Sequence, residues 1–206
     1  MHFRKLVISP HIDDEILGCG GTLDKDTFVL EIGVDDFHIV SRDERILELQ
    51  EAKKILNFSF AILENNIVNS YRIDEIINPI TDYINEIKPD EIYIPYPSYN
   101  QDHKTTYEAA LVALRPHDLN FFVKKVFVYE ETQVYLWDYS YNLNGSFKPN
   151  YFRKIDIAKK LLAYNCLKSQ VRSFRSPIML EELAKIRGRQ SKLDFAEAFQ
   201  AIRYIE

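Results

Sequence analysis

A histidine and three consecutive acids stand near the start of the chain, in the stretch SPHIDDEILGCGGTL (residues 9–23). The four residues are His11, Asp13, Asp14 and Glu15. They directly follow a short apolar run, so the carboxylates are expected where a buried strand ends. Imidazole and carboxylate groups bind divalent metal ions, and a carboxylate beside a metal-bound water can act as a general base. A His and an Asp three residues apart can reach one ion if the turn is tight, and the pattern therefore indicates a candidate metal site.

Two other interpretations fit the same stretch. The acids could be a solvated loop that stabilises a helix N-terminus. Gly18 and Gly20 also match the start of the dinucleotide pattern G-x-G-x-x-G, but Leu23 stands at its third glycine position and the acids would repel a pyrophosphate. We expect instead that the glycines let the following helix pack closely against the sheet.

A second polar cluster follows another apolar run and contains Asn100, Asp102 and His103. Among the five histidines, only His11 and His103 stand at expected strand-to-helix junctions with acids beside them. Open α/β sheets bind ligands outside the carboxyl ends of their strands. We therefore expect the two clusters to supply ligands to one site.

Strand and helix patterns alternate from Lys5 to Glu130, which is typical of parallel βαβ units with right-handed crossovers. Pro79 lies inside one helical pattern, so that helix either begins near Asn78 or kinks at the proline. The last helix is expected to break near Gly188. The expected strands cover residues 5–9, 28–34, 58–63, 91–97 and 121–130, and the expected helices cover 41–56, 73–87, 104–114, 156–171 and 179–202.

The length and composition favour a single domain. The chain has 206 residues, of which 46% are hydrophobic and 28% charged, as in ordinary globular proteins. We expect one domain over residues 1–206. Residues 131–150 are polar and aromatic, and we expect a hairpin excursion turning at Asn144–Gly145, or a lid over the site.

The charge pattern indicates which partners to expect, and the cysteine content indicates the compartment. The two cysteines, Cys19 and Cys166, make a disulfide framework unexpected and favour a reducing compartment. A net charge of -5 without a long basic run argues against nucleic acid or an anionic membrane as the main partner. No apolar run approaches the ~20 residues of a membrane helix, and the first ten residues are too short and too charged for a signal peptide. We expect a cytoplasmic protein without stable membrane association, and a homo-oligomer is possible.

The combination of PHIDDEILGCGGTL with the downstream NQDH resembles the LmbE-like or PIG-L-type metal-dependent de-N-acetylases. Their first motif is usually written H-P-D-D-E, and their second ends in D-H. RILELQEAKKIL resembles the family's R-x-x-E-x-x-x-A helix, FKPNYFRKIDI and KLLAYNCLKSQ resemble its late strand and helix, and RGRQSKLDFAEAF resembles its closing segment. The resemblance implies a three-layer, Rossmann-like α/β fold with a mostly parallel sheet.

The resemblance also implies roles for the two clusters. His11, Asp14 and His103 would bind one zinc ion per chain, although other divalent metals suit the same ligands. Asp13 would be the general base. Asp102 would orient a neighbouring ligand.

This sequence departs from the family pattern at two positions. Ile12 replaces the proline of the first motif, and its side chain is expected to face away from the metal. Asn100 stands where some relatives carry a histidine that assists the oxyanion or the leaving amine. An amide donates a hydrogen bond but supplies no proton at neutral pH, so we expect Asn100 to stabilise the oxyanion and Asp13 to return the proton. Glu15 is expected to be structural.

The activity implied by the resemblance is hydrolytic removal of an N-acetyl group from an N-acetylglucosamine-type amino sugar. Arg45 and Tyr99 are candidate substrate-binding residues, while Arg187 and Arg189 would either meet a phosphate or decorate a helix end. Two alternatives stay open: a zinc amidase for a larger acyl amide or thiol conjugate, and a non-catalytic relative that binds a sugar or nucleotide. A purely structural zinc site is less expected, because such sites usually have four ligands and are rich in cysteine.

Overall fold

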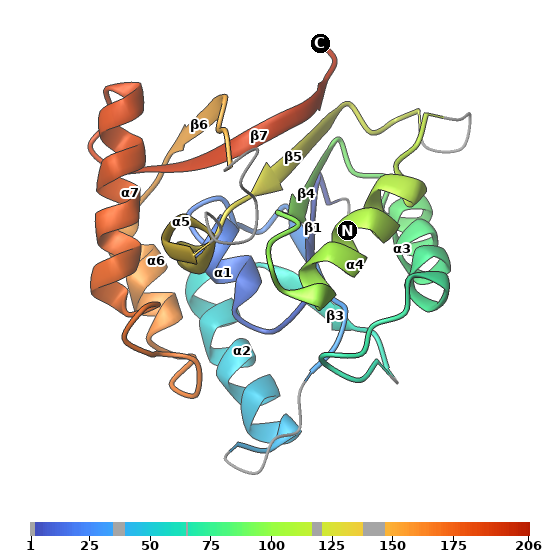
Figure 1. The fold of residues 1–206 in the computed structure, drawn as a ribbon, viewed down its shortest axis with the longest axis horizontal. Coiled ribbons are helices and arrows are strands. Elements are labelled where there is room, and N and C mark those ends of the chain that lie inside the picture. Colours follow the sequence, from blue (N-terminus) through green and yellow to red (C-terminus); the bar gives the residue numbers. More distant parts are fainter. Residues whose placement is uncertain (1–2, 35–39, 65, 117–120, 138–146) are drawn as a thin grey trace.

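The centre of the molecule is a seven-stranded sheet with the order β3-β2-β1-β4-β5-β7-β6 (Figure 1). The computed structural model describes residues 3–34, 40–64, 66–116, 121–137 and 147–206. The first five strands of this order, from β3 through β2, β1 and β4 to β5, are parallel to one another. Strand β7 pairs antiparallel with both β5 and β6. The strands are β1 (Lys5–Ser9), β2 (Thr27–Glu31), β3 (Ser59–Ile62), β4 (Glu91–Pro95), β5 (Lys125–Tyr129), β6 (Tyr151–Lys154) and β7 (Ala196–Tyr204). The expected mostly parallel α/β sheet is confirmed.

Helices cover both faces of the sheet and form a three-layer structure (Figure 1). In β1, Leu6 and Ile8 pack into the core on the side of α3 and α4, whereas Val7 packs into the core on the side of α1, α2, α6 and α7. Burial on both faces explains why the strand is a continuous apolar run. The helices are α1 (Asp14–Cys19), α2 (Arg42–Leu56), α3 (Ile73–Ile87), α4 (Gln101–Ala113), α5 (Thr132–Trp137), α6 (Ile157–Tyr164) and α7 (Pro177–Ser191).

Several helix boundaries differ from the sequence prediction. Helix α3 contains Pro79 and begins at Ile73, so a start near Asn78 is wrong. Helix α4 begins at Gln101 rather than at residue 104, because the Asn100 side chain caps it. Gly18 lies inside α1, and a Cβ there would come within 2.2 Å of the Tyr129 ring of β5, so this glycine does allow close packing on the sheet.

The C-terminal segment is a strand and not the predicted end of a helix. Helix α7 ends at Ser191, and Lys192 follows with a left-handed φ of 58°. Gly188 does not break the helix; it admits the returning chain, since a Cβ there would lie 2.6 Å from the carbonyl oxygen of Asp194. Strand β7 then fills the slot between β5 and β6. Its sequence AEAFQAIRY favours a helix locally, and pairing on both sides overrides that preference.

The segment 131–150 begins with a helix rather than a hairpin strand. Residues 132–137 form α5, while residues 138–146, with the expected turn at Asn144–Gly145, lie outside the described residues. Within the described chain, none of the helices has the length and the apolar character needed to cross a bilayer.

A half-buried carboxylate, Glu91, lies at the end of β4 that is farther from the site and forms an ion pair whose contribution to stability can be measured. Glu91 accepts hydrogen bonds from Tyr93 Oη at 2.9 Å and from Arg153 at 3.2 Å. Burial acts to raise the pKa of Glu91, but Arg153 and Tyr93 outweigh it and lower the pKa. The charged carboxylate therefore stabilises the fold above the unfolded-state pKa of about 4.3, and this contribution is lost as the pH falls through the lower folded-state pKa.

We expect Glu91→Gln to lower the free energy of unfolding by about 1–2 kcal/mol at pH 7, because a charged acceptor is lost. Urea unfolding from pH 7 down to pH 3.5 measures the effect, and the difference from wild type should shrink below pH ~4. Glu86→Gln on the exposed face of α3 is the control. A difference that is constant across this pH range would contradict the account.

Candidate active site

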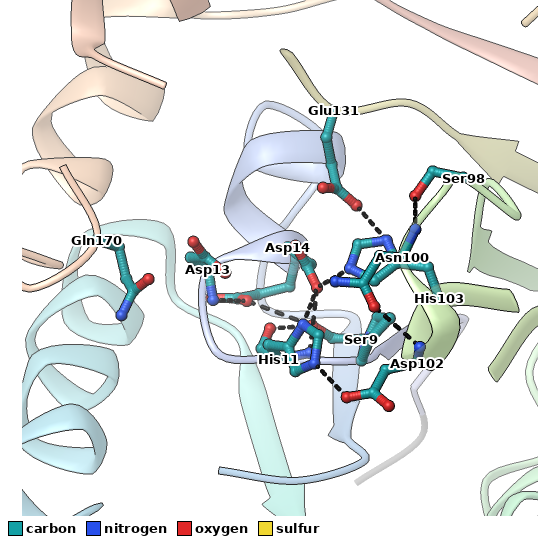
Figure 2. A network of polar contacts seen from close by, with 12 residues as sticks. Ser9, His11, Asp13, Asp14, Ser98, Asn100, Asp102, His103, Glu131 and Gln170 are labelled. Carbon is teal, nitrogen blue, oxygen red and sulfur yellow. Dashed lines mark hydrogen bonds and ion pairs between the residues drawn. The ribbon is translucent and has the colours of Figure 1, made fainter. Parts of the chain in front are cut away.

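Two loops at the carboxyl edge of the sheet bring His11, Asp14 and His103 together (Figure 2). The first two residues follow β1, and His103 lies in the first turn of α4, which follows the neighbouring strand β4. One ligand atom from each residue lies within 4.8 Å of the others. Asp14 Oδ2 is 3.2 Å from His11 Nδ1 and 3.1 Å from His103 Nε2. The two sequence clusters therefore converge as expected.

The backbone around Asp13 is strained and is held in place by Glu15. Asp13 has a φ of 132°, which a residue other than glycine rarely adopts and which costs about 1–3 kcal/mol. Glu15 Oε2 accepts a hydrogen bond from the Asp13 N–H at 2.9 Å, and Ser9 Oγ donates to the carbonyl oxygen of His11 at 2.7 Å. These contacts fix the sharp turn that places Asp13 and Asp14 in the same site.

Each histidine has a second carboxylate on its far nitrogen. Asp102 Oδ2 lies 2.9 Å from His11 Nε2, and it also accepts a hydrogen bond from the Asn69 N–H at 2.6 Å. Glu131 Oε1 lies 3.2 Å from His103 Nδ1. Such carboxylates set the tautomer and the ring orientation of metal-binding histidines. They leave His11 Nδ1 and His103 Nε2 turned toward Asp14.

The donor set fits a divalent metal ion. Neither buried ring nitrogen of His103 makes a hydrogen bond within the described residues, although carboxylate oxygens lie close to both. Burial acts to lower the pKa of His11, but Asp102 and Asp14 outweigh it and raise the pKa to about 9. In the metal-free protein the imidazoles therefore hold protons that balance the buried carboxylates. A divalent cation would replace those protons, and two imidazoles with one carboxylate are a common zinc ligand set.

Asp13 lies beside this set with its own cationic partner. Arg175 donates to Asp13 Oδ2 at 2.6 Å, and Gln170 accepts from the same guanidinium at 3.0 Å. Burial raises the pKa of Asp13 to about 7, while Arg175 opposes the rise. A carboxyl group with a pKa near neutrality can both take and return a proton.

Asn100 is oriented by its role as a helix cap. Its Oδ1 accepts a hydrogen bond from the Asp102 N–H at 2.9 Å. Since the oxygen is occupied, the amide NH₂ group is the end that points toward His11 and Asp14 (Figure 2). The arrangement presents a neutral hydrogen-bond donor beside the candidate metal ligands.

A cavity of about 240 Å³ opens above these residues. Arg45 lines it from α2 and is 5% exposed, whereas Tyr99 is 39% exposed and is not among its lining residues. Arg187 lies elsewhere, in a buried ion pair with Glu130, so a role in phosphate binding is wrong for this arginine. Arg189 is exposed on α7 and lines a different surface hollow.

Sequence reasoning missed several residues of the site. Glu131 follows β5, so the rule that placed His11 and His103 at strand ends could have found it. Arg172, Phe174 and Arg175 also line the cavity. They come from an irregular turn after α6, where no sequence signal indicated a contact with the first loop.

Comparison with known proteins adds evidence independent of this geometry. The sequence model of the PIG-L family, described as GlcNAc-PI de-N-acetylase, matches residues 34–114. The resemblance to the PIG-L family is confirmed. The matched segment includes Arg45, Asn100, Asp102 and His103, and it begins after the His11–Glu15 cluster. No curated protein sequence matches the chain.

Solved structures of a deacetylase and of other proteins share the fold. The conserved protein TT1542 from Thermus thermophilus has a TM-score of 0.77 at 22% identity, covering 99% of this chain and 96% of its own. The N,N'-diacetylchitobiose deacetylase from Pyrococcus horikoshii has a TM-score of 0.76 at 20% identity, covering 97% and 84%. GalB, the 4-carboxy-2-hydroxymuconate hydratase from Pseudomonas putida, has a TM-score of 0.75 at 18% identity, covering 100% and 99%. At these identities, the likeness establishes the fold.

We expect zinc to stabilise the metal-free protein, because the ion binds the folded site and not the unfolded chain. At a free zinc concentration one hundred times the dissociation constant, the gain is about 2.7 kcal/mol, or a rise in Tm of roughly 5–10 °C for a chain of this size. Differential scanning calorimetry of chelator-treated protein, with and without zinc, measures it. Asp14→Asn should lose most of the rise, and Asp82→Asn on α3 should keep it. An equal rise in both variants would contradict the site.

Proposed function

We propose that this protein is a metal-dependent de-N-acetylase that hydrolyses the N-acetyl group of an N-acetylglucosamine-type amino sugar. The convergence of His11, Asp14 and His103 beside Asp13, in a cavity open to a ligand, is the observation that supports it. The PIG-L family match and the deacetylase among the structural neighbours support the same reaction. Zinc is the proposed metal.

The three converging residues would hold the metal. When bound there, zinc lowers the pKa of its water and polarises the amide carbonyl. The protein's own residues supply the proton transfers and the orientation, as the position of each side chain indicates.

Asp13 takes a proton from the attacking water. Its ionised form is stabilised by Arg175, which also fixes the carboxylate in position through the 2.6 Å contact. The Asn100 amide donates a hydrogen bond to the oxyanion that forms on the acetyl carbon. Asp13 then passes its proton to the departing nitrogen, and the C–N bond breaks to give acetate and the free amine. The pKa of about 7 suits both of these roles.

Two alternative functions, an amidase and a non-catalytic binder, are compatible with parts of the evidence. A zinc amidase for a larger acyl amide or thiol conjugate would use the same residues. The hydratase among the structural neighbours shows that the fold is also used by an enzyme of another class. A non-catalytic binder is less favoured, because the four residues His11, Asp13, Asp14 and His103 are all present and converge.

We expect Asp13→Asn to reduce kcat for acetate release from N,N'-diacetylchitobiose or N-acetylglucosamine by roughly 10²–10⁴-fold, because the proton acceptor is lost. Metal content, measured by mass spectrometry of the purified variant, should stay near one ion per chain. Asp82→Asn is the matched control and should retain wild-type kcat.

Three results would contradict this proposal. The first is an Asp13→Asn variant that keeps more than a tenth of the wild-type kcat. The second is acetate release that persists after complete removal of metal by a chelator. The third is release of longer acyl groups with no acetate release, which would favour the amidase alternative.

A further inference from the structure

Three arginines line the cavity, although the chain as a whole is acidic. Arg45, Arg172 and Arg175 line it together with the exposed ring of Phe174. The net charge of the chain is -5. Three guanidinium groups around one cavity are therefore a local feature and not a consequence of composition.

The three arginines have different surroundings. Arg175 is committed to Asp13 and Gln170 through its two terminal nitrogens. Arg45 is buried on α2. Arg172 is exposed, and its guanidinium makes no ion pair or side-chain hydrogen bond with any part of the chain that the structure describes. Arg172 thus presents an uncompensated positive charge at the cavity.

The turn that carries Arg172 is held firmly to the rest of the molecule. Arg172 and Arg175 pair through an isolated backbone bridge, with the Arg175 N–H donating to the Arg172 carbonyl oxygen at 3.1 Å. The fully buried Tyr164 of α6 donates to the carbonyl oxygen of Arg175 at 2.7 Å. The guanidinium groups are therefore presented from a fixed backbone, which reduces the entropy lost on binding.

Helix α2 contacts the segment that leads into this turn and also contributes Arg45 to the lining of the cavity. Glu48 accepts hydrogen bonds from the N–H and the Oγ of Ser169 at 2.9 and 2.5 Å. Arg45 lies three residues earlier on the same face of α2. The contact that anchors the turn thereby also sets the spacing between Arg45 and the turn. Gln170 lies across Asp13 from His103 (Figure 2), so the turn borders the side of the cavity opposite the candidate metal ligands.

We propose that Arg172, supported by Arg175 and Phe174, forms a subsite for an anionic oxygen group, a phosphate or a carboxylate, carried by the amino sugar beyond the acetyl group. A guanidinium binds either group with two parallel hydrogen bonds, and an exposed aromatic ring offers a face for the sugar. The inference names a substrate class for the proposed deacetylase, and it rests on that proposed function.

The test compares neutral and anionic probes of otherwise similar structure. N-acetylglucosamine is the neutral probe, N-acetylglucosamine 1-phosphate carries a phosphate, and N-acetylmuramic acid carries a carboxylate. Wild-type kcat/KM should be at least tenfold higher for one of the charged probes, and the preferred probe identifies the source of the anion. In Arg172→Gln the ratio of charged to neutral kcat/KM should fall about tenfold, mainly through KM, and Arg172→Lys should restore part of it.

Arg189→Gln on α7 is the matched control, because it removes the same charge from a surface away from the cavity. It should change the ratio by less than twofold. An Arg172→Gln ratio equal to that of wild type, or an equal fall in both variants, would overturn the subsite.

A second measurement separates failure of the subsite from failure of the proposed function. Calorimetry of glucosamine 1-phosphate and glucosamine binding to the metal-loaded protein needs no turnover. If no probe releases acetate, the proposed function fails. The subsite is still supported in that case if glucosamine 1-phosphate binds more tightly than glucosamine and Arg172→Gln removes the difference. The subsite is overturned if glucosamine 1-phosphate and glucosamine bind equally well, or if glucosamine 1-phosphate binds equally well to the wild-type protein and to Arg172→Gln.

Discussion

The shared carboxylate oxygen of Asp14 is the contact on which the rest of the site depends. It lies within 3.2 Å of one nitrogen from each of two imidazoles that are 92 residues apart in the chain, at positions 11 and 103. Strands β1 and β4 are neighbours in a parallel sheet, so their following loops leave it at the same edge. The sheet thereby brings two distant motifs together as one candidate ligand set. The strained backbone of Asp13 is held by the hydrogen bond from its N–H to Glu15, and the same turn delivers both acids to that point.

Burial makes the charged carboxylates of the site costly in free energy unless cationic groups lie beside them. The carboxylates of Asp14, Asp102 and Glu131 have almost no access to water, and they surround the equally buried imidazole of His103 and the partly exposed imidazole of His11. An isolated buried charge would be very costly, and these acids are retained because each faces a group that can be cationic. Burial raises the pKa of Asp13 to about 7, the range that the proposed proton exchange requires. Arg175 limits that rise, so the pKa of Asp13 is set by two opposing effects, burial and the neighbouring guanidinium.

The sequence predicted the parts of this structure that depend on local patterns. The alternation of strands and helices and the convergence of His11 with His103 both followed from spacing and from the topology of parallel sheets. Strand β7 was misassigned because AEAFQAIRY has helical preference, and only the vacant slot between β5 and β6 makes it a strand. The turn that carries Arg172 and Arg175 lies 162 residues from Asp13, and no local pattern encodes that contact.

The most direct test of the central claim is a crystal structure of the zinc-loaded protein with anomalous diffraction at the zinc edge. The account predicts one ion held by His11 Nδ1, the Asp14 carboxylate and His103 Nε2, with the Asp13 carboxylate beside it. An anomalous peak at other residues, or imidazole rings too far apart to share an ion, would contradict it.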